Sequence, residues 1–196
     1  MLLAGEAQQH STIIPQTGNP HKRESHFSSP QMSRAEFIRS VSNGDPFSLT
    51  GLWLPGIAGL NVESQPAGEY SYITELPTTV NRFQLADSYG SIGLLAHAHH
   101  AGAYFHQLVN EQSITLIYGD GTTVDYLIQD ILEYRATDPL DPFTDFMDSG
   151  DTRVIQKDLF SSIYSKPGRL ILQTCIIRGS ENMWGRKFII AEPVRH

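Results

Sequence analysis

The chain has 196 residues, and its 14 lysines and arginines against 21 aspartates and glutamates give a formal net charge of −7. This acidic balance argues against a general nucleic-acid-binding surface, which needs clustered lysine and arginine. A content of 40% hydrophobic and 18% charged residues is typical of a folded protein, and the length suits one domain with a substantial core.

The sequence has no obvious signal for membrane insertion or export. No apolar run approaches the roughly 20 residues of a membrane-spanning helix. The opening segment, Met1-Leu-Leu-Ala-Gly-Glu6, is too short for the core of a signal peptide. We therefore expect a soluble chain with no membrane span.

The first 31 residues are polar and interrupted by prolines, so we predict a flexible tail over 1–31 and one folded domain over 32–196. The domain should begin with a short helix, because Ser33 and Glu36 have the spacing of a capping box. The apolar residues that follow form one stripe, and Asn43-Gly44 would end the helix. We expect this helix to cover one end of the core.

From residue 47 onward, short apolar or alternating runs separated by turns predict β-strands. We expect strands at 49–54, 82–86, 91–97, 114–118, 122–128, 131–136, 170–177 and 187–191. Asp120-Gly121 between two of these runs indicates a tight hairpin whose turn has positive φ at both central positions. Seven or eight strands at this spacing predict an all-β fold, either a sandwich or a closed barrel.

A long insertion at 137–168 interrupts the strand pattern and holds six aspartates but no glutamate. Leu159 and Ile163 lie four residues apart in its later part, which predicts a second short helix. Connections of this length in compact domains are usually functional or disordered.

Cys175 is the only cysteine, so it cannot form an internal disulfide or a multi-cysteine metal site. It is either an inert apolar residue or a nucleophile. Its strand is apolar on both faces except at Gln173, Thr174 and Cys175, which indicates that the strand reaches the surface there. A thiol has a reference pKa of about 8.5 and needs a base or cation to react. Arg186 would face Cys175 if 170–177 and 187–191 pair as a hairpin.

Histidines form a second cluster of reactive side chains. His97 ends an apolar strand, His99 and His100 follow, and His106 comes shortly afterwards. The sequence offers no carboxylate or second cysteine at a suitable local spacing for zinc. An imidazole that exchanges protons near neutral pH is the better use for one of these residues, although a histidine-cluster metal-binding protein is an alternative.

With these residues laid out, the chain resembles the sortases, a family of cysteine transpeptidases, over about 47–193. Sortases carry a histidine just after an apolar strand, as in Leu94-Leu-Ala-His97. They carry a cysteine motif of the type Thr-Leu-x-Thr-Cys, here Leu170-Ile-Leu-Gln-Thr-Cys175, and an arginine at the start of the last strand, here Arg186. The first threonine of the motif is replaced by Ile171 or, in another register, by Leu170.

The resemblance implies a closed barrel of seven to eight strands, with the insertion forming one wall of the substrate groove. It implies His97, Cys175 and Arg186 as catalytic residues, and we assign Thr174 to substrate binding. His99 or His100 could replace His97, but His97 alone follows directly from the strand.

The implied reaction attaches proteins to cell wall or pilin. The cysteine would attack a peptide sorting signal, and an amine acceptor or water would resolve the thioester. No cofactor is implied, although some sortases hold calcium with acidic residues of the insertion, which here would be Asp138, Asp141, Asp145, Asp148 and Asp151. The family acts outside the membrane, whereas this sequence has no export signal. The alternatives are an inactive or weakly active peptide-binding relative, and a plain cysteine hydrolase.

Overall fold

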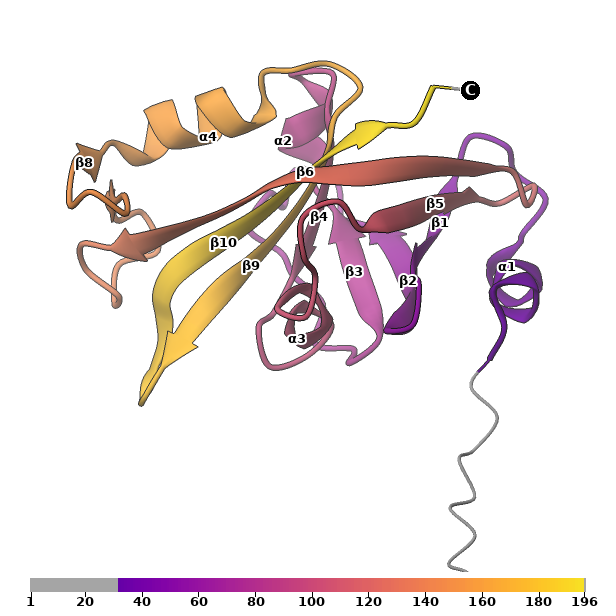
Figure 1. Ribbon diagram of the computed structural model, residues 1–196, viewed down its shortest axis with the longest axis horizontal. Helices are drawn as coiled ribbons and strands as arrows, with labels where there is room; N and C mark the ends of the chain where they lie inside the picture. The colour runs from indigo at the N-terminus through magenta and orange to yellow at the C-terminus, as the bar shows by residue number, and fades with distance from the viewer. Residues whose placement is uncertain (1–31, 196) are drawn as a thin grey trace, which may run out of the picture. The chain divides into compact units, whose positions relative to one another are not determined.

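The computed structural model describes residues 32–195, so the predicted tail lies outside the described part of the chain. Eight strands follow one another in the order β10-β9-β4-β3-β2-β1-β5-β6, and β6 pairs back onto β10. This pairing closes the sheet into a barrel (Figure 1). The predicted all-β closed barrel is confirmed.

The barrel strands are of unequal length, and two minor strands extend the sheet beyond β6. The barrel strands are β1 (Leu49–Leu54), β2 (Ala58–Ser64), β3 (Thr79–Arg82), β4 (Ile92–Ala96), β5 (Ser113–Tyr118), β6 (Thr123–Ala136), β9 (Leu170–Arg178) and β10 (Glu181–Pro193). The extension consists of β7 (Phe146–Met147) and β8 (Arg153–Val154). The pairs β2–β3 and β4–β9 are parallel, and the other pairs are antiparallel.

Both predicted helices are present, and two single-turn helices accompany them. They are α1 (Arg34–Val41), α2 (Gln84–Asp87), α3 (Gly102–Phe105) and α4 (Gln156–Tyr164). Ser33 and Glu36 form the predicted capping box at the start of α1. Phe37 of α1 packs on Gly59, where any side chain would collide with the aromatic ring. No helix among residues 32–195 combines the length and the apolar character that crossing a membrane requires.

Strand alternation divides the buried residues into two hydrophobic clusters. One fills the barrel interior and includes Leu94, Leu172 and Ile189. The other lies on the outer face of the same strands, where Leu95, Ile171 and Phe188 pack beneath α4 and α2. In Figure 1, α4 and α2 lie along the upper side of the barrel, and α3 lies on the lower side. Strands covered on both faces explain the continuous apolar run at 170–172.

The structure differs from the predicted strands in three places. Residues 82–86 were predicted as a strand, but β3 ends at Arg82 and α2 follows, because Phe83 and Ala86 are spaced for a helical turn that buries both in the outer cluster. Strand β2 was not predicted. Residues 122–128 and 131–136 form one strand, β6, because the polar residue Gln129 sits in a bulge opposite β10 and does not end the strand.

The predicted hairpin between β5 and β6 is present, but its turn differs from the expected one. The N–H of Gly121 donates to the carbonyl of Tyr118, and the N–H of Tyr118 donates to the carbonyl of Thr122. Gly121 has a φ of +87°, whereas Asp120 is not among the residues with positive φ. The connection is therefore a three-residue loop that ends in a left-handed glycine.

Strand β9 has positions inside and outside the inner cluster, so truncations along it should differ in their cost. Leu172→Ala should lower the free energy of unfolding by about 2–5 kcal/mol, because it leaves a cavity at a fully buried position. Ile177→Ala on the same strand should change it by less than about 0.5 kcal/mol, because Ile177 is exposed. Urea denaturation of both variants measures the difference, and equal effects would contradict the assignment of the two faces.

Candidate functional site

Cys175 lies where β9 emerges from the protein. Residues Leu170, Ile171 and Leu172 are fully buried, and exposure increases towards Arg178. Cys175 is half-buried and free. Because side chains alternate along a strand, it points to the outer face together with Ile171 and Gln173. The sulfur therefore lies at the edge of the outer cluster and is not sealed in the barrel interior.

Arg186 lies directly opposite Cys175 in the antiparallel β9–β10 pair. Its Nη1 donates a hydrogen bond to the Sγ of Cys175 over 3.2 Å. Gly185, the preceding residue, allows this placement, because a side chain there would collide with the carbonyl oxygen of Tyr134 on β6. The expected hairpin contact between the arginine and the thiol is thus present.

The parallel pairing of β4 with β9 brings the segment that carries His97 beside Cys175. Ala96 pairs with Thr174, so His97 and Cys175 are the next residues along the two neighbouring strands. His97 follows the alternation that puts Leu95 in the outer cluster. Its carbonyl accepts hydrogen bonds from the N–H groups of His100 and Gly102, each at 3.0 Å, and these bonds end the strand in a turn.

The Thr174 hydroxyl joins the two strands. Thr174 is 2% exposed, and its Oγ1 donates to the carbonyl of Ala96 over 2.9 Å. A side chain at Gly102 would collide with this hydroxyl. These contacts favour a structural role for Thr174 that holds β4 in register with β9, and its predicted role in substrate binding stays a prediction.

Two further residues border the site: Glu75, which the sequence did not single out, and His106, a member of the histidine cluster noted in the sequence. Glu75, in the connection between β2 and β3, places Oε1 3.3 Å from Nε2 of His97. His106 places Nε2 3.2 Å from the carbonyl oxygen of Cys175. Glu75 lies 22 residues before His97 in an irregular segment, so no periodicity or motif could have indicated it.

The insertion borders the outer face beside Cys175. Tyr164 of α4 donates its hydroxyl proton to Oε1 of Gln173 over 2.8 Å. Burial raises the pKa of Tyr164 far above its ordinary value, so this hydroxyl stays protonated. A surface pocket lies between β6 and the insertion, lined by Tyr134, Asp148 and Ser149 among others. Tyr134 pairs with Arg186 across β6 and β10, so one lining residue of the pocket is a strand neighbour of the arginine.

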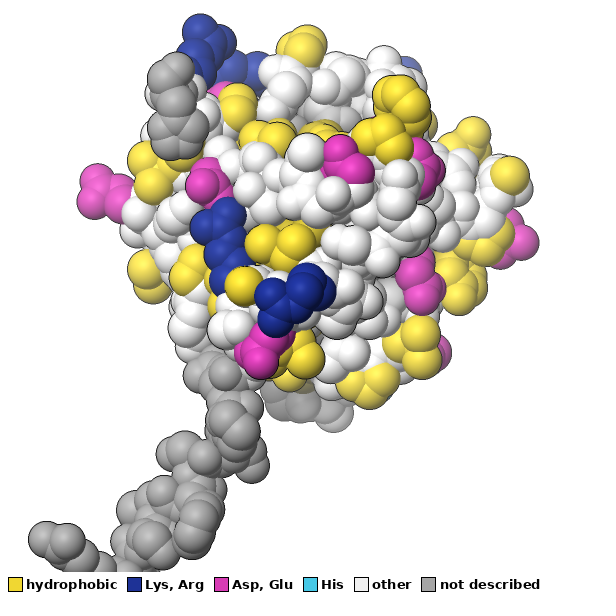
Figure 2. Space-filling model, turned by 90° about the vertical axis from the view of Figure 1, so that its right-hand side faces the viewer, with side chains coloured by type: hydrophobic (Ala, Val, Ile, Leu, Met, Phe, Trp, Pro, Cys, Tyr) yellow, Lys and Arg dark blue, Asp and Glu magenta, His cyan; other side chains and the backbone are white. Residues whose placement is uncertain are grey.

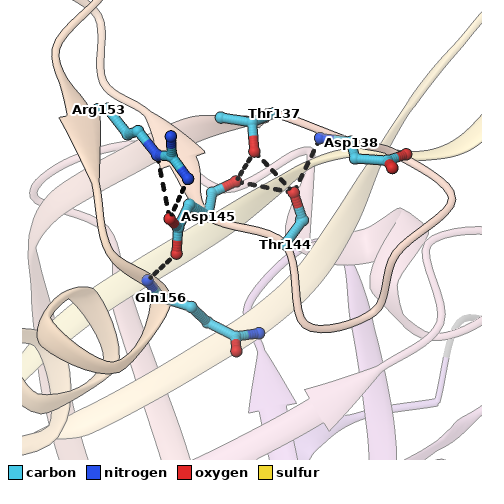
Figure 3. Close-up of polar contacts among 6 residues, drawn as sticks. All are labelled: Thr137, Asp138, Thr144, Asp145, Arg153 and Gln156. Carbon is cyan, nitrogen blue, oxygen red and sulfur yellow. Dashed lines mark hydrogen bonds and ion pairs between the residues drawn. The ribbon is translucent and has the colours of Figure 1, made fainter.

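Hydrogen bonds within the insertion occupy the aspartates that were considered for calcium. Asp145 accepts from Arg153 and from the N–H of Gln156 at the start of α4 (Figure 3). These donors, the backbone N–H first, hold the pKa of Asp145 below its usual value. Asp138, Asp141 and Asp148 accept N–H groups of their own turns. Within residues 32–195, no three of the insertion's aspartates converge on one point, and calcium binding there stays a prediction.

Known proteins resemble this chain in structure but not detectably in sequence. No family model and no curated protein sequence matches the chain. Among solved structures, sortase C1 from Streptococcus suis is similar at 14% identity and a TM-score of 0.51, covering 83% of this chain and 78% of that one. Sortase C-1 from Actinomyces oris is similar at 15% identity and a TM-score of 0.51, covering 86% of each chain.

The chain has the sortase fold. At these identities the likeness concerns the fold alone, and it assigns no role to His97, Cys175 or Arg186. The sortase-like closed barrel expected from the three sequence motifs is confirmed, and the strands that carry or precede the arginine, cysteine and histidine are neighbours in the order β10-β9-β4.

The hydrogen bond of Thr174 to Ala96 generates a prediction that tests the structural role of this threonine. Thr174→Val should lower the free energy of unfolding by about 1–3 kcal/mol, because it leaves the buried carbonyl of Ala96 without its donor. Thr78→Val, at an exposed position, is the matched control and should have little effect. Thermal or urea unfolding measures both. A Thr174 variant of unchanged stability would contradict the structural role.

Proposed function

We propose that the protein is a sortase-like cysteine transpeptidase in which Cys175 is the nucleophile. The observation that carries this proposal is the 3.2 Å contact from the Arg186 guanidinium to the half-buried sulfur. A guanidinium at this distance can donate a charge-assisted hydrogen bond to a thiolate, the form in which a cysteine acts as a nucleophile. A buried structural cysteine needs no such partner, so the contact argues against the inert alternative.

In the first half of the reaction, the Cys175 thiolate attacks the carbonyl carbon of a peptide bond in a sorting signal. A bond forms between Sγ and that carbon, and the oxygen becomes an oxyanion that the Arg186 guanidinium stabilises. His97, as imidazolium, transfers a proton to the leaving amine nitrogen as the C–N bond breaks. The products are a thioester on Cys175, a free amine and a neutral His97.

In the second half, an amine acceptor attacks the thioester carbonyl. A new C–N bond forms, the C–S bond breaks, and the proton lost by the amine returns to His97. Water in place of the amine gives hydrolysis. This cycle needs no group beyond the side chains of the chain and its two substrates.

The substrate class is proposed from the likeness to sortases. The pocket beside Tyr134 and the helix α4 border the face of the sheet that carries Cys175, which supports a peptide substrate bound along that face. We propose a peptide sorting signal of a protein as the acyl donor and an amine of cell wall or pilin as the acceptor. These partners would place the reaction outside the membrane.

Capture of the acyl-enzyme tests the proposed nucleophile. Incubation with a library of short peptides should give a hydroxylamine-sensitive mass increase on the peptide that contains Cys175, detected by mass spectrometry. Cys175→Ala should give none. An added small amine should attack the thioester in place of water, so that an amide is released instead of the acid, which separates a transpeptidase from a hydrolase. Peptide cleavage by Cys175→Ala at the wild-type rate would end the proposal.

The arginine contact generates a second test that needs no substrate. Arg186→Gln should slow alkylation of Cys175 by iodoacetamide at neutral pH about tenfold, the effect of losing one charge-assisted hydrogen bond worth on the order of 1.5 kcal/mol. Arg186→Lys should restore part of the rate. The matched control is Arg178→Gln in the same hairpin, since Arg178 stacks on Trp184 at 4.2 Å.

The alkylation rates also decide between the enzyme and its alternative. If Arg186→Gln and Arg178→Gln react as fast as the wild type, the guanidinium does not activate the thiol. An inactive peptide-binding module that retains the three residues would then be the better description.

A further inference from the structure

The turn after β4 brings three histidines and one glutamate together beside the proposed site. Glu75 Oε2 lies 3.0 Å from Nε2 of His100 and 3.9 Å from Nε2 of His99. The other oxygen, Oε1, contacts His97. The rings of His99 and His100 are 4.2 Å apart. The sequence lacked a carboxylate ligand near the histidines, and the β2–β3 connection supplies one.

The spacing of these atoms suits a transition metal. One ligand atom each from Glu75, His99 and His100 lies within 4.8 Å of the others. Zinc binds imidazole nitrogen and carboxylate oxygen at about 2.0–2.2 Å, so tetrahedral ligands lie roughly 3.3–3.5 Å from one another. The observed distances of 3.0 and 3.9 Å lie on either side of this value, and small rotations of exposed side chains would bring them to it.

We propose that Glu75, His99 and His100 bind a divalent transition metal, with zinc as the expected ion. Imidazole favours zinc, copper or nickel over calcium and magnesium, which prefer all-oxygen sites. Two histidines and one glutamate leave the fourth position of a tetrahedral zinc to water. The ligands are partly exposed, with side-chain exposures of 74%, 54% and 24% for Glu75, His99 and His100, so an ion can enter from solvent.

This site is distinct from the nucleophile but adjoins the proposed acid. The carboxylate that would ligate the metal through Oε2 contacts His97 through Oε1. A hydrogen bond from a neighbouring group to a ligating carboxylate orients that ligand and strengthens the site. His97 would therefore support the metal from outside its ligand set. An occupied site would in turn hold Glu75 against His97, a link to catalysis that rests on the proposed function.

The face on which this cluster lies differs from the one that carries α1. Figure 2 views the right-hand side of Figure 1, where α1 lies, and shows a few acidic and basic side chains scattered among hydrophobic and other ones. No histidine of the described residues is in view there. The metal site is thus a local feature of the β4 turn and the β2–β3 connection.

Zinc affinity of the full chain, purified without a polyhistidine tag, tests this inference by competition with a chromophoric chelator. Wild type should bind one zinc ion more tightly than the variants. The double substitution His99→Asn with His100→Asn should weaken that binding at least about 100-fold, and His97→Asn about tenfold, as for loss of a supporting partner. Calcium should not displace the zinc.

Glu75→Gln and Glu69→Gln form a matched pair, since both glutamates are exposed in the same connection. Glu75→Gln should weaken zinc binding, and Glu69→Gln should not. The histidines outside the cluster are unchanged in every protein compared, so they cannot produce the differences. Equal zinc affinity of the wild type and the double histidine variant would overturn the site. Because the experiment measures zinc binding, equal affinities would leave the acyl-transfer proposal standing. Failure to form a thioester on Cys175 would in turn leave the metal site standing.

Discussion

The register of β9 between its two neighbours is the constraint on which the site depends. Its antiparallel pairing with β10 sets Arg186 opposite Cys175, and its parallel pairing with β4 sets Ala96 opposite Thr174. A slip of one residue on either side would move a side chain to the other face of the sheet. The Thr174 hydroxyl and the buried residues of both clusters hold this register. Residues far apart in the chain therefore meet without help from a flexible loop.

The two hydrophobic clusters explain why the proposed catalytic residues lie at one end of the strands. Along β9, residues 170–172 are buried on both faces. One face packs into the barrel interior, and the other packs beneath α4. Beyond Gln173 the helix no longer covers the outer face, and Tyr164 closes the cluster with a hydrogen bond to that glutamine. Polar and ionisable side chains are tolerated from this point onward because solvent can reach them.

Much of this arrangement could be predicted from local patterns, and the remainder could not. The capping box at Ser33, the helix at Leu159 and Ile163, and the apolar strand before Cys175 each have a signal within a few residues. The segment after Arg82 was assigned wrongly because packing against the outer cluster decides between strand and helical turn there. Short apolar runs do not distinguish these two outcomes.

Contacts between distant segments lie beyond such patterns. Glu75 meets three histidines only because the β2–β3 connection returns to the end of β4. The pairing of Arg186 with Cys175 was accessible because the two strands are neighbours in sequence and form a hairpin. The hydrogen bond from Thr174 to Ala96 was not accessible, since the two residues lie 78 positions apart on different strands.

A crystal structure of the protein carbamidomethylated at Cys175 tests the central claim most directly, because it locates the sulfur and both proposed partners in one experiment. The account predicts that the adduct projects from the outer face of the barrel, with the Arg186 guanidinium and the His97 imidazole lying on either side of it. An adduct that enters the barrel interior, or a His97 ring that lies on the opposite face of the sheet, would contradict it.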